Sequence, residues 1–380
     1  MSPVPPQLSK TISTKLDFLG ITSSSDLHLG NHRVNSAHLT RNYVNVIFPY
    51  LSKSKYFWMV GDLLDRAIVL ADPQSGDVLD FIEKLLVELD KHGVTARFLR
   101  GTFTHDRIQL GHVQRMHRNF GLKNDVRVVD NIELEEMPDG LRLLYLPDDL
   151  PQENADQVLE LVHTMMADRG WDYVDYALVH GCFDFVGFGE RIAFRSEQFA
   201  FVRRKVLVGH IHTAQSEGNV IYHGSPERFS HGEEEAKGFL FIEDRYPKEV
   251  KTTFVENTHS TWFKTFDDSR APLDSIVSIW TERFDSAPQG CMSNFRLIHP
   301  DPATRAVVEK ISRGYPNVVF SSIPPKDKNT QKAAESIVAK TYVAGKITTQ
   351  ETLPEDILDF IKESGADTTL DKDKIKNYLT

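Results

Sequence analysis

Short apolar segments alternate with longer amphipathic ones along the first hundred residues of the chain. Residues 16–21, 56–60 and 96–99 are apolar runs that stop at polar or turn residues, which is the pattern of buried strands. Residues 36–51 and 77–91 carry apolar side chains close to helical spacing, which predicts a helix after each of the first two strands. This alternation of strand and helix predicts a layered α/β fold.

The same pattern continues to about residue 267 and becomes richer in strands in its second half. A hairpin is expected at Pro138-Asp139-Gly140, because this is a turn sequence between two apolar runs. Further strands are predicted at 126–129, 132–137, 141–146, 176–179, 205–208, 220–222, 238–243, 251–255 and 261–266, and a helix at 154–169.

The chain is expected to divide into five parts. Beyond residue 267, the segments 275–284, 301–313 and 317–322 are interpreted as strand, helix and strand of a small α/β module. Two helices expected at 354–364 and 371–378 have apolar spacing that suits docking of a partner, and equally suits contact with their own domain. The five parts are an N-terminal arm at 1–15, a large α/β domain at 16–267, the small module at 268–322, a linker at 323–350 and a C-terminal helical segment at 351–380.

Composition restricts the class of protein. A hydrophobic content of 40% and a charged content of 26% are ordinary for a soluble globular chain. No apolar stretch is long enough for a membrane-spanning helix, and the N-terminal arm lacks the apolar core of a signal peptide. The two cysteines, Cys182 and Cys291, do not form a disulfide framework, so we expect a cytoplasmic protein with no membrane association.

The net charge of −10 argues against a protein that holds nucleic acid by bulk positive charge. A local basic groove, or metal ions that face phosphate, remains compatible with it. Arg100, Arg107, Arg203 and Arg204 are candidates for contacts to a DNA backbone, and the equal alternative is that they are solvated charges beside strands.

Aspartate and histidine side chains follow five of the predicted strands directly. Because the carboxyl ends of neighbouring strands form the ligand-binding edge of open α/β sheets, we expect these side chains to converge. In chain order the five groups are Asp26 and His28; Asp62 and Asp65; Thr102, Thr104, His105 and Asp106; His180; and His210 and His212.

The convergence of these groups predicts a centre of two divalent ions. Two residues that are two positions apart in an extended segment point the same way, so each Asp-x-His or His-x-His pair can act together. Oxygen and imidazole ligands suit Mn²⁺, our first choice, or Fe²⁺ or Zn²⁺ better than Mg²⁺ or Ca²⁺. The expected assignment gives Asp26, His28 and His212 to one ion, His180 and His210 to the other, and Asp62 to both.

Three Asp and His residues of these groups are left for other roles. Two ions about 3.5–4 Å apart clamp a phosphate and activate water for in-line attack, so His105 is a candidate to protonate the leaving oxygen or to contact the phosphate. Asp106 is expected to orient His105, as a carboxylate often orients an active histidine. Asp65 either ligates or orients, or caps a following helix.

This series of motifs resembles that of the calcineurin-like metallophosphoesterases. Within that superfamily, Asp26-Leu27-His28-Leu29-Gly30 matches the opening motif of the SbcD-like DNA repair nucleases. The stretch from Tyr222 to Ser230, followed by Lys237-Gly238-Phe239, resembles the segment after the last motif of those nucleases. The likeness covers about residues 16–267, and the short form is most similar to the versions carried by large bacteriophages.

The resemblance implies both a fold and an activity. The implied fold is a four-layer α-β-β-α sandwich with a small α/β capping domain and C-terminal helices. The implied activity is that of a Mn²⁺-dependent nuclease, exonucleolytic on duplex ends and endonucleolytic on single strands, in double-strand-break processing and recombination. The implied partners are DNA, an SMC-like (SbcC-type) ATPase and a second copy of the chain, in the host cytoplasm if a phage encodes it.

One stretch departs from the family pattern. The family has Gly-Asn-His followed by Asp or Glu after the third strand, with the asparagine on a metal ion. Here the stretch runs from Gly101 to Asp106 with two added residues and no asparagine. A hydroxyl is a poorer ligand than an amide oxygen, so Thr102, Thr104 or water fills the place and the second ion is expected to bind less tightly.

Two other functions stay open on the sequence. The first is a metallophosphatase or cyclic-nucleotide phosphodiesterase, which the acidic net charge favours slightly and the additional C-terminal parts disfavour. The second is a weakly active recruitment subunit, in which the altered loop has cost activity and binding to DNA ends is what remains.

Overall fold

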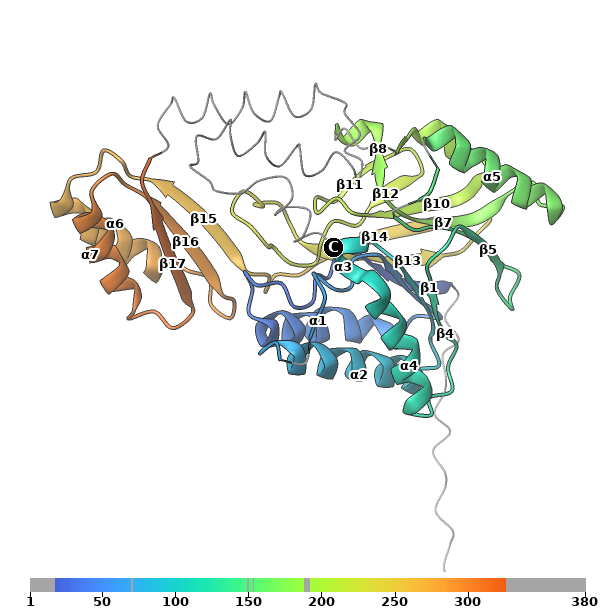
Figure 1. Cartoon of the computed structure of the whole chain (residues 1–380), viewed down its shortest axis with the longest axis horizontal. Coiled ribbons are helices and arrows are strands. Elements are labelled where there is room, and N and C mark those ends of the chain that lie inside the picture. The colour runs from blue at the N-terminus through green and yellow to red at the C-terminus, as the bar shows by residue number, and fades with distance from the viewer. Residues whose placement is uncertain (1–17, 70, 149, 153, 188–191, 326–380) are drawn as a thin grey trace, which may run out of the picture. The chain divides into compact units, whose positions relative to one another are not determined.

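Two six-stranded sheets lie face to face in the computed structural model, which describes residues 18–69, 71–148, 150–152, 154–187 and 192–325 (Figure 1). The first sheet is, in spatial order, β14 (Val250–Glu256), β13 (Gly238–Asp244), β1 (Leu19–Ser24), β2 (Tyr56–Val60), β3 (Thr95–Leu99) and β4 (Val126–Val129). Strands β1 to β4 run parallel, while β13 is antiparallel to both β1 and β14.

The second sheet has a similar mixed organisation. Its strands are, in spatial order, β11 (Gln215–Glu217), β12 (Val220–Tyr222), β10 (Val202–Gly209), β7 (Val174–His180), β6 (Arg142–Leu146) and β5 (Glu133–Glu136). The central strands β12, β10, β7 and β6 are parallel, and the two edge strands are antiparallel to their neighbours. Parallel strands buried on both faces carry continuous apolar runs, which is why the sequence identifies them.

Helices cover the outer faces of the two sheets (Figure 1). Helices α1 (Ser36–Leu51), α2 (Ser75–Lys91) and α4 (Gly111–Asn119) lie on the first sheet, and α5 (Ala155–Asp168) lies on the second. Helix α1 begins after Asn35, whose side chain accepts the His38 N–H at 3.1 Å. Short helices α3 (Phe103–Asp106) and η1 (Arg107–Leu110) join β3 to α4.

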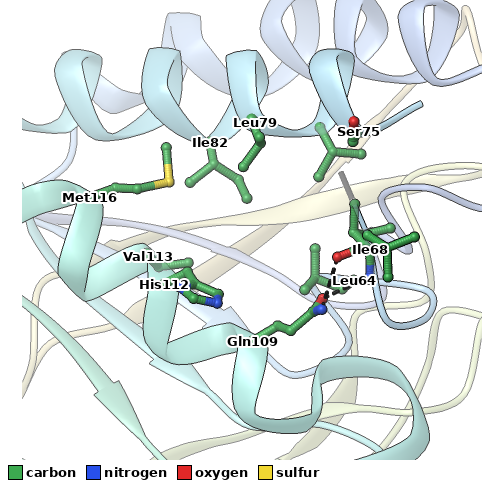
Figure 2. A pocket seen from close by; sticks show the side chains of 11 residues that line it. Leu64, Ile68, Ser75, Leu79, Ile82, Gln109, His112, Val113 and Met116 are labelled. Carbon is green, nitrogen blue, oxygen red and sulfur yellow. Dashed lines mark hydrogen bonds between the residues drawn. The ribbon is translucent and has the colours of Figure 1, made fainter. Parts of the chain in front are cut away.

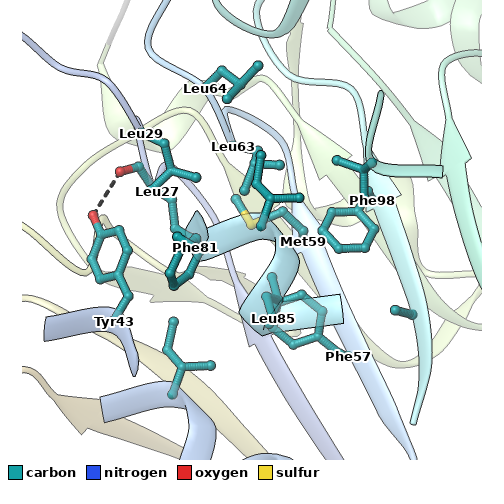
Figure 3. Packing of buried hydrophobic residues seen from close by; sticks show 14 of the residues in the cluster. Leu27, Leu29, Tyr43, Phe57, Met59, Leu63, Leu64, Phe81, Leu85 and Phe98 are labelled. Carbon is teal, nitrogen blue, oxygen red and sulfur yellow. Dashed lines mark hydrogen bonds between the residues drawn. The ribbon is translucent and has the colours of Figure 1, made fainter. Parts of the chain in front are cut away.

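Three apolar clusters hold these layers together. The cluster under α1 and α2 includes Tyr43, Phe57 and Phe81, and the Tyr43 hydroxyl donates to the Leu27 carbonyl at 2.8 Å (Figure 3). A second cluster, with Trp58 at its centre, lies between the two sheets, and a third lies between the second sheet and α5. The layer order is therefore α-β-β-α, as the resemblance implied.

The small module is a three-stranded parallel sheet with two helices. It consists of β15 (Trp262–Asp267), α6 (Leu273–Asp285), β16 (Ser293–Ile298), α7 (Pro302–Ser312) and β17 (Val318–Ile323). Two sequence interpretations are corrected here. Residues 275–284 form a helix and not a strand, and β15 belongs to this sheet although the sequence placed it in the larger domain.

The reason for the first correction is visible in the burial pattern. Ile276, Trp280 and Phe284 are buried, and they are four residues apart, which is the spacing of one helix face. The strand expected there is instead β16, whose pairing on both sides makes it the centre of the sheet. The two helices expected beyond residue 350 lie outside the described residues.

An apolar cavity of about 400 Å³ lies between α2 and α4 (Figure 2). Leu79 and Ile82 line it from α2, and Val113 and Met116 line it from α4. The cavity contains none of the predicted metal ligands. Among the helices of the described residues, none is long and apolar enough to cross a membrane.

Candidate metal centre

The carboxyl ends of five strands meet between the two sheets. Strands β1, β2 and β3 deliver the groups at Asp26, Asp62 and Thr102, and strands β7 and β10 deliver His180 and His210 from the second sheet. All six residues that the sequence assigned to metal ions fall within groups of Asp and His whose ligand atoms lie within 4.8 Å of one another. Four of these side chains are buried and two, His210 and His212, are half-buried, and together they are arranged as a metal site requires.

One group consists of Asp26, His28 and His212. The Nε2 atoms of His28 and His212 face each other at 3.0 Å, and each lies 4.0 Å from Asp26 Oδ1. The two oxygens of the Asp26 carboxylate also accept the backbone N–H of His210, at 3.0 and 3.1 Å. This contact connects the end of β1 to the end of β10.

The other group consists of Asp62, His180 and His210. Asp62 Oδ2 lies 3.4 Å from His180 Nε2 and 3.7 Å from His28 Nε2, so the same carboxylate oxygen borders both groups. This position between the groups is the geometry that a carboxylate shared by two ions needs.

His180 provides an independent test of whether the residues fit a cation. Its Nδ1–H donates to the Val60 carbonyl at 2.9 Å, which leaves Nε2 as the ring atom that faces the centre. That Nε2 atom is buried and has no hydrogen-bond partner among the described residues, which is costly for a polar atom unless a ligand completes it. A divalent metal ion is the ligand that Asp62, His180 and His210 can bind together.

Backbone conformation also marks the centre. In the described part of the chain, four residues other than glycine have a positive φ, and they are Asp26 (54°), His28 (46°), Asp62 (51°) and His210 (89°). Non-glycine residues rarely adopt this conformation, and such strain is found preferentially at functional sites. All four are residues that the sequence assigned to metal ions.

Two glycines allow the strand ends to approach so closely. A Cβ on Gly61 would lie 1.9 Å from His180 Nδ1, and a Cβ on Gly101 would lie 2.2 Å from Asp62 Oδ1. Gly61 also has a φ of +85°, which other residues rarely adopt. Both positions therefore require glycine.

The electrostatics of the centre favour positive charge beside Asp62. Burial alone would raise the pKa of Asp62, but His180 and His105 hold it well below its usual value, so this carboxylate keeps its charge. Burial would lower the pKa of His180, but Asp62 raises it to about 10. Burial, followed by the neighbouring His180, lowers the pKa of His210.

The loop that replaces the family's asparagine places Thr102, and not Thr104, beside Asp62. The Thr102 N–H donates to Asp62 Oδ1 at 2.6 Å and its hydroxyl donates to Oδ2 at 3.2 Å, whereas Thr104 is exposed. His105 is half-buried, and its Nδ1 lies 2.8 Å from Asp62 Oδ2. His105 also forms a group with His28 and Asp62 that could itself hold an ion.

Asp106 bonds to backbone groups and not to His105, the residue that it was expected to orient. Its buried carboxylate accepts the backbone N–H groups of Gly101 (2.8 Å), Leu64 (3.0 Å) and Asp62 (3.1 Å), and no hydrogen bond joins it to His105 among the described residues. Burial, with the nearby Asp62, raises its pKa to about 6. Asp106 therefore fastens two strand ends together, and the expectation that it orients His105 is wrong.

Asp65 does not cap a helix. Its Oδ1 lies 3.2 Å from His28 Nδ1 and accepts the Asn31 side-chain N–H at 2.7 Å. A carboxylate on the second ring nitrogen is the usual way of fixing the orientation of a ligating histidine. Of the roles considered for Asp65, this geometry favours orientation.

The sequence reasoning missed three residues around His212. The buried Lys237 ammonium donates to the His212 carbonyl at 2.9 Å and lies 2.8 Å from Glu233 Oε2, which in turn is 3.9 Å from His212 Nδ1. The buried Phe229 ring contacts both His28 and His212. Phe229 and Lys237 belong to the stretch after the last motif that the sequence singled out, whereas Glu233 lies between its two parts and carried no such signal.

The arginines proposed for DNA fall into different settings. Arg204 is half-buried and pairs with Asp175 at 3.1 Å and with Asp244, so it joins the two sheets and does not face solvent. It precedes Gly209, the last residue of β10, by five residues, or about 16 Å of strand. This corrects its assignment as a DNA contact.

The other three arginines lie at two different places in the chain. Arg203 is exposed at the same remote end of β10, where its guanidinium stacks on the Tyr173 ring. Arg100 is half-buried near the centre and donates to the Asp148 carbonyl at 3.2 Å. Arg107 is the first residue of η1, directly after Asp106. Arg100 and Arg107 therefore follow the strand ends of the centre, whereas Arg203 does not.

Comparisons with known proteins add little to this geometry. No protein-family model matches the chain, and no curated protein matches it. A crystal structure of TT1561 from Thermus thermophilus is 12% identical over 63% of this chain and 99% of its own, with a TM-score of 0.40. A cold-active protein-tyrosine phosphatase from a psychrophilic Shewanella species is 13% identical over 62% of this chain and 80% of its own, with a TM-score of 0.29. The function is therefore inferred from the residues of this chain.

Proposed function

We propose that this protein is a metal-dependent phosphodiesterase that cleaves DNA. The observation that carries the proposal is Asp62, whose carboxylate borders two groups of buried Asp and His ligands. Divalent ions, when bound, supply the positive charge that polarises a phosphate and activates water for in-line attack. The Asp and His donor set suits Mn²⁺, Fe²⁺ or Zn²⁺.

The protein's own residues would hold and orient this centre. Asp65 and Lys237 fix the side chain of His28 and the backbone of His212, respectively. His105 is half-buried beside Asp62, and the hydrogen bond with Asp62 raises its pKa, so it can carry the proton that a leaving oxygen needs. We therefore assign general-acid chemistry to His105.

Support for DNA as the substrate comes from the resemblance of residues 26–30 and 222–230 to the SbcD-like nucleases. The α/β module that follows the sandwich in the sequence would correspond to the capping domain that the resemblance implies. On the same basis we propose that the protein acts as a dimer with an SMC-like ATPase in the processing of DNA ends.

The test is cleavage of linear, nicked and single-stranded DNA across Mn²⁺, Fe²⁺, Zn²⁺ and Mg²⁺, with and without the ATPase. We expect cleavage in Mn²⁺, and we expect His105→Ala to retain bound metal but lose cleavage. His112→Ala, which removes an exposed histidine of α4, is the matched control and should cleave normally. A wild-type protein that binds manganese and leaves every DNA intact would refute the proposal, and cleavage by His105→Ala would remove His105 from it.

A phosphomonoesterase is the second candidate, because a net charge of −10 disfavours a long polyanion more than a small phosphate ester whose charge the metal ions can balance. Turnover of a bis-aryl phosphodiester, an aryl phosphomonoester and DNA separates the two. A marked preference for the monoester would favour this second candidate.

A further inference from the structure

The connection between β7 and β10 has an unusual form for two parallel strands. Directly after His180 the chain makes β8 (Cys182–Phe183), η2 (Asp184–Val186), β9 (Ala193–Phe194) and η3 (Ser196–Phe199). Strands β8 and β9 pair with each other, and the buried rings of Phe183, Phe194 and Phe199 contact one another. This connection therefore builds an apolar wall immediately beside a candidate metal ligand.

A cavity of about 330 Å³ lies between this wall and the metal centre. His180, His210 and Thr102 border it on the side of the centre. Leu150, Ile192 and Phe194 are among its apolar lining residues. Small-molecule sites begin at about 300 Å³, so the cavity has room for one small organic group but not for a stretch of duplex.

The charge of the lining limits what the cavity can hold. Among the described residues that line it, the cavity has the carboxylate of Asp148 and no lysine or arginine. The backbone of Asp148 is paired with Arg100 in both directions, but no described residue donates a hydrogen bond to its carboxylate. A carboxylate without a cation repels a second phosphate and accepts a hydrogen bond from an uncharged N–H or O–H group.

We propose that this cavity binds an unpaired nucleoside attached to the scissile phosphate, with Asp148 accepting a hydrogen bond from its base or sugar. A nucleoside matches the three observed properties, since it is flat and largely apolar on its faces, carries N–H and O–H donors at its edges, and has no charge. The inference rests on the proposed function, because the shared histidines place the cavity next to the reacting phosphate.

The test compares two diesters that share a leaving group, thymidine 5′-(4-nitrophenyl phosphate) and methyl 4-nitrophenyl phosphate, in Mn²⁺. We expect the wild type to prefer the thymidine ester in kcat/KM by about tenfold or more, the amount that one base contact contributes. Ile192→Trp fills the cavity and should bring this ratio close to one, and Asp148→Ala should reduce it.

Ile132→Trp is the matched control. Ile132 is a partly buried residue packed on the same apolar cluster as Ile192, but it does not line the cavity, so this variant should keep the wild-type ratio. Thermal melting of both variants shows whether they fold alike. Equal use of both esters by the wild type, or an unchanged ratio in a folded Ile192→Trp, would overturn the inference and leave the phosphodiesterase in place. Failure to hydrolyse either ester would instead refute the proposed function.

Discussion

Nε2 of His180 lies 3.4 Å from Oδ2 of Asp62, and the other ring nitrogen of His180 donates to the Val60 carbonyl at 2.9 Å. The second contact fixes Nδ1 as a donor, and the first places Nε2 beside the carboxylate that borders both ligand groups. This pair joins the two sheets at their ligand-binding edge, because Asp62 follows β2 and His180 ends β7.

Replacement of His180 by alanine should remove one bound ion and leave the other. The reason is that His180 belongs to the group with Asp62 and His210, whereas Asp26, His28 and His212 are untouched. Calorimetric titration with Mn²⁺ should show two sites in the wild type and one in His180→Ala. His163→Ala, which removes an exposed histidine of α5, should keep both sites, and loss of all binding in His180→Ala would show that the two groups do not act separately.

Thr102→Asn should strengthen the weaker of the two metal sites. Thr102 lies beside Asp62, and an amide oxygen is a better ligand than a hydroxyl. We expect the weaker Mn²⁺ site to tighten by about tenfold, the low end of what single partners of a metal site contribute. Thr104→Asn is the control, since Thr104 is exposed, and an equal gain there would contradict the placement of Thr102.

Asp106→Ala should lower the free energy of unfolding by more than the loss of one hydrogen bond would. The change leaves three backbone N–H groups at Gly101, Asp62 and Leu64 without their acceptor, at about 1 kcal/mol or more each. Urea unfolding should therefore show a loss of at least about 3 kcal/mol. The exposed Asp168→Ala should change stability little, and an equally small loss for Asp106→Ala would mean that water replaces the carboxylate.

His223 should make stability depend on pH below neutrality. Its Nδ1–H donates to the Val208 carbonyl at 2.8 Å and its Nε2 lies 2.7 Å from the Ser23 hydroxyl, so the buried ring is neutral. Burial lowers its pKa from 6.5 to about 4. The folded state therefore disfavours protonation, and stability is lost as the pH falls from about 6.5 towards 4, by roughly 3 kcal/mol.

The comparison that isolates this effect is with His223→Gln, which does not titrate. Urea unfolding of both proteins from pH 7.5 to pH 4.5 should give curves that converge as the pH falls, because only the wild type loses the contribution of His223. Parallel curves would contradict the prediction.

Much of the fold followed from local patterns. Buried parallel strands have continuous apolar sequences, so the sequence predicts β1, β2, β3, β7 and β10. The Asp and His residues of the site lie at or directly after the ends of these strands, so the sequence indicates them as well. Helix α6 was missed although Ile276, Trp280 and Phe284 have helical spacing, because a short apolar run does not by itself distinguish a helix from a strand.

The remaining parts of the site depend on contacts between distant segments. Arg204 pairs with Asp244, which lies forty residues further along and in the other sheet. Asp106 is next to His105 in sequence, but its partners are backbone N–H groups that follow β2 and β3. Sequence spacing indicates which residues lie at the same edge of a sheet. Only the folded chain shows which of these residues form hydrogen bonds or ion pairs with one another.

Cleavage of linear duplex and single-stranded DNA by metal-free protein, titrated with Mn²⁺ and compared with Asp62→Asn, tests the account most directly. We predict no cleavage without metal, cleavage that rises as two ions bind per chain, and loss of both the paired ions and the activity in Asp62→Asn. DNA cleavage that persists in the chelated protein or in Asp62→Asn, or two bound manganese ions with no cleavage of any DNA, would contradict it.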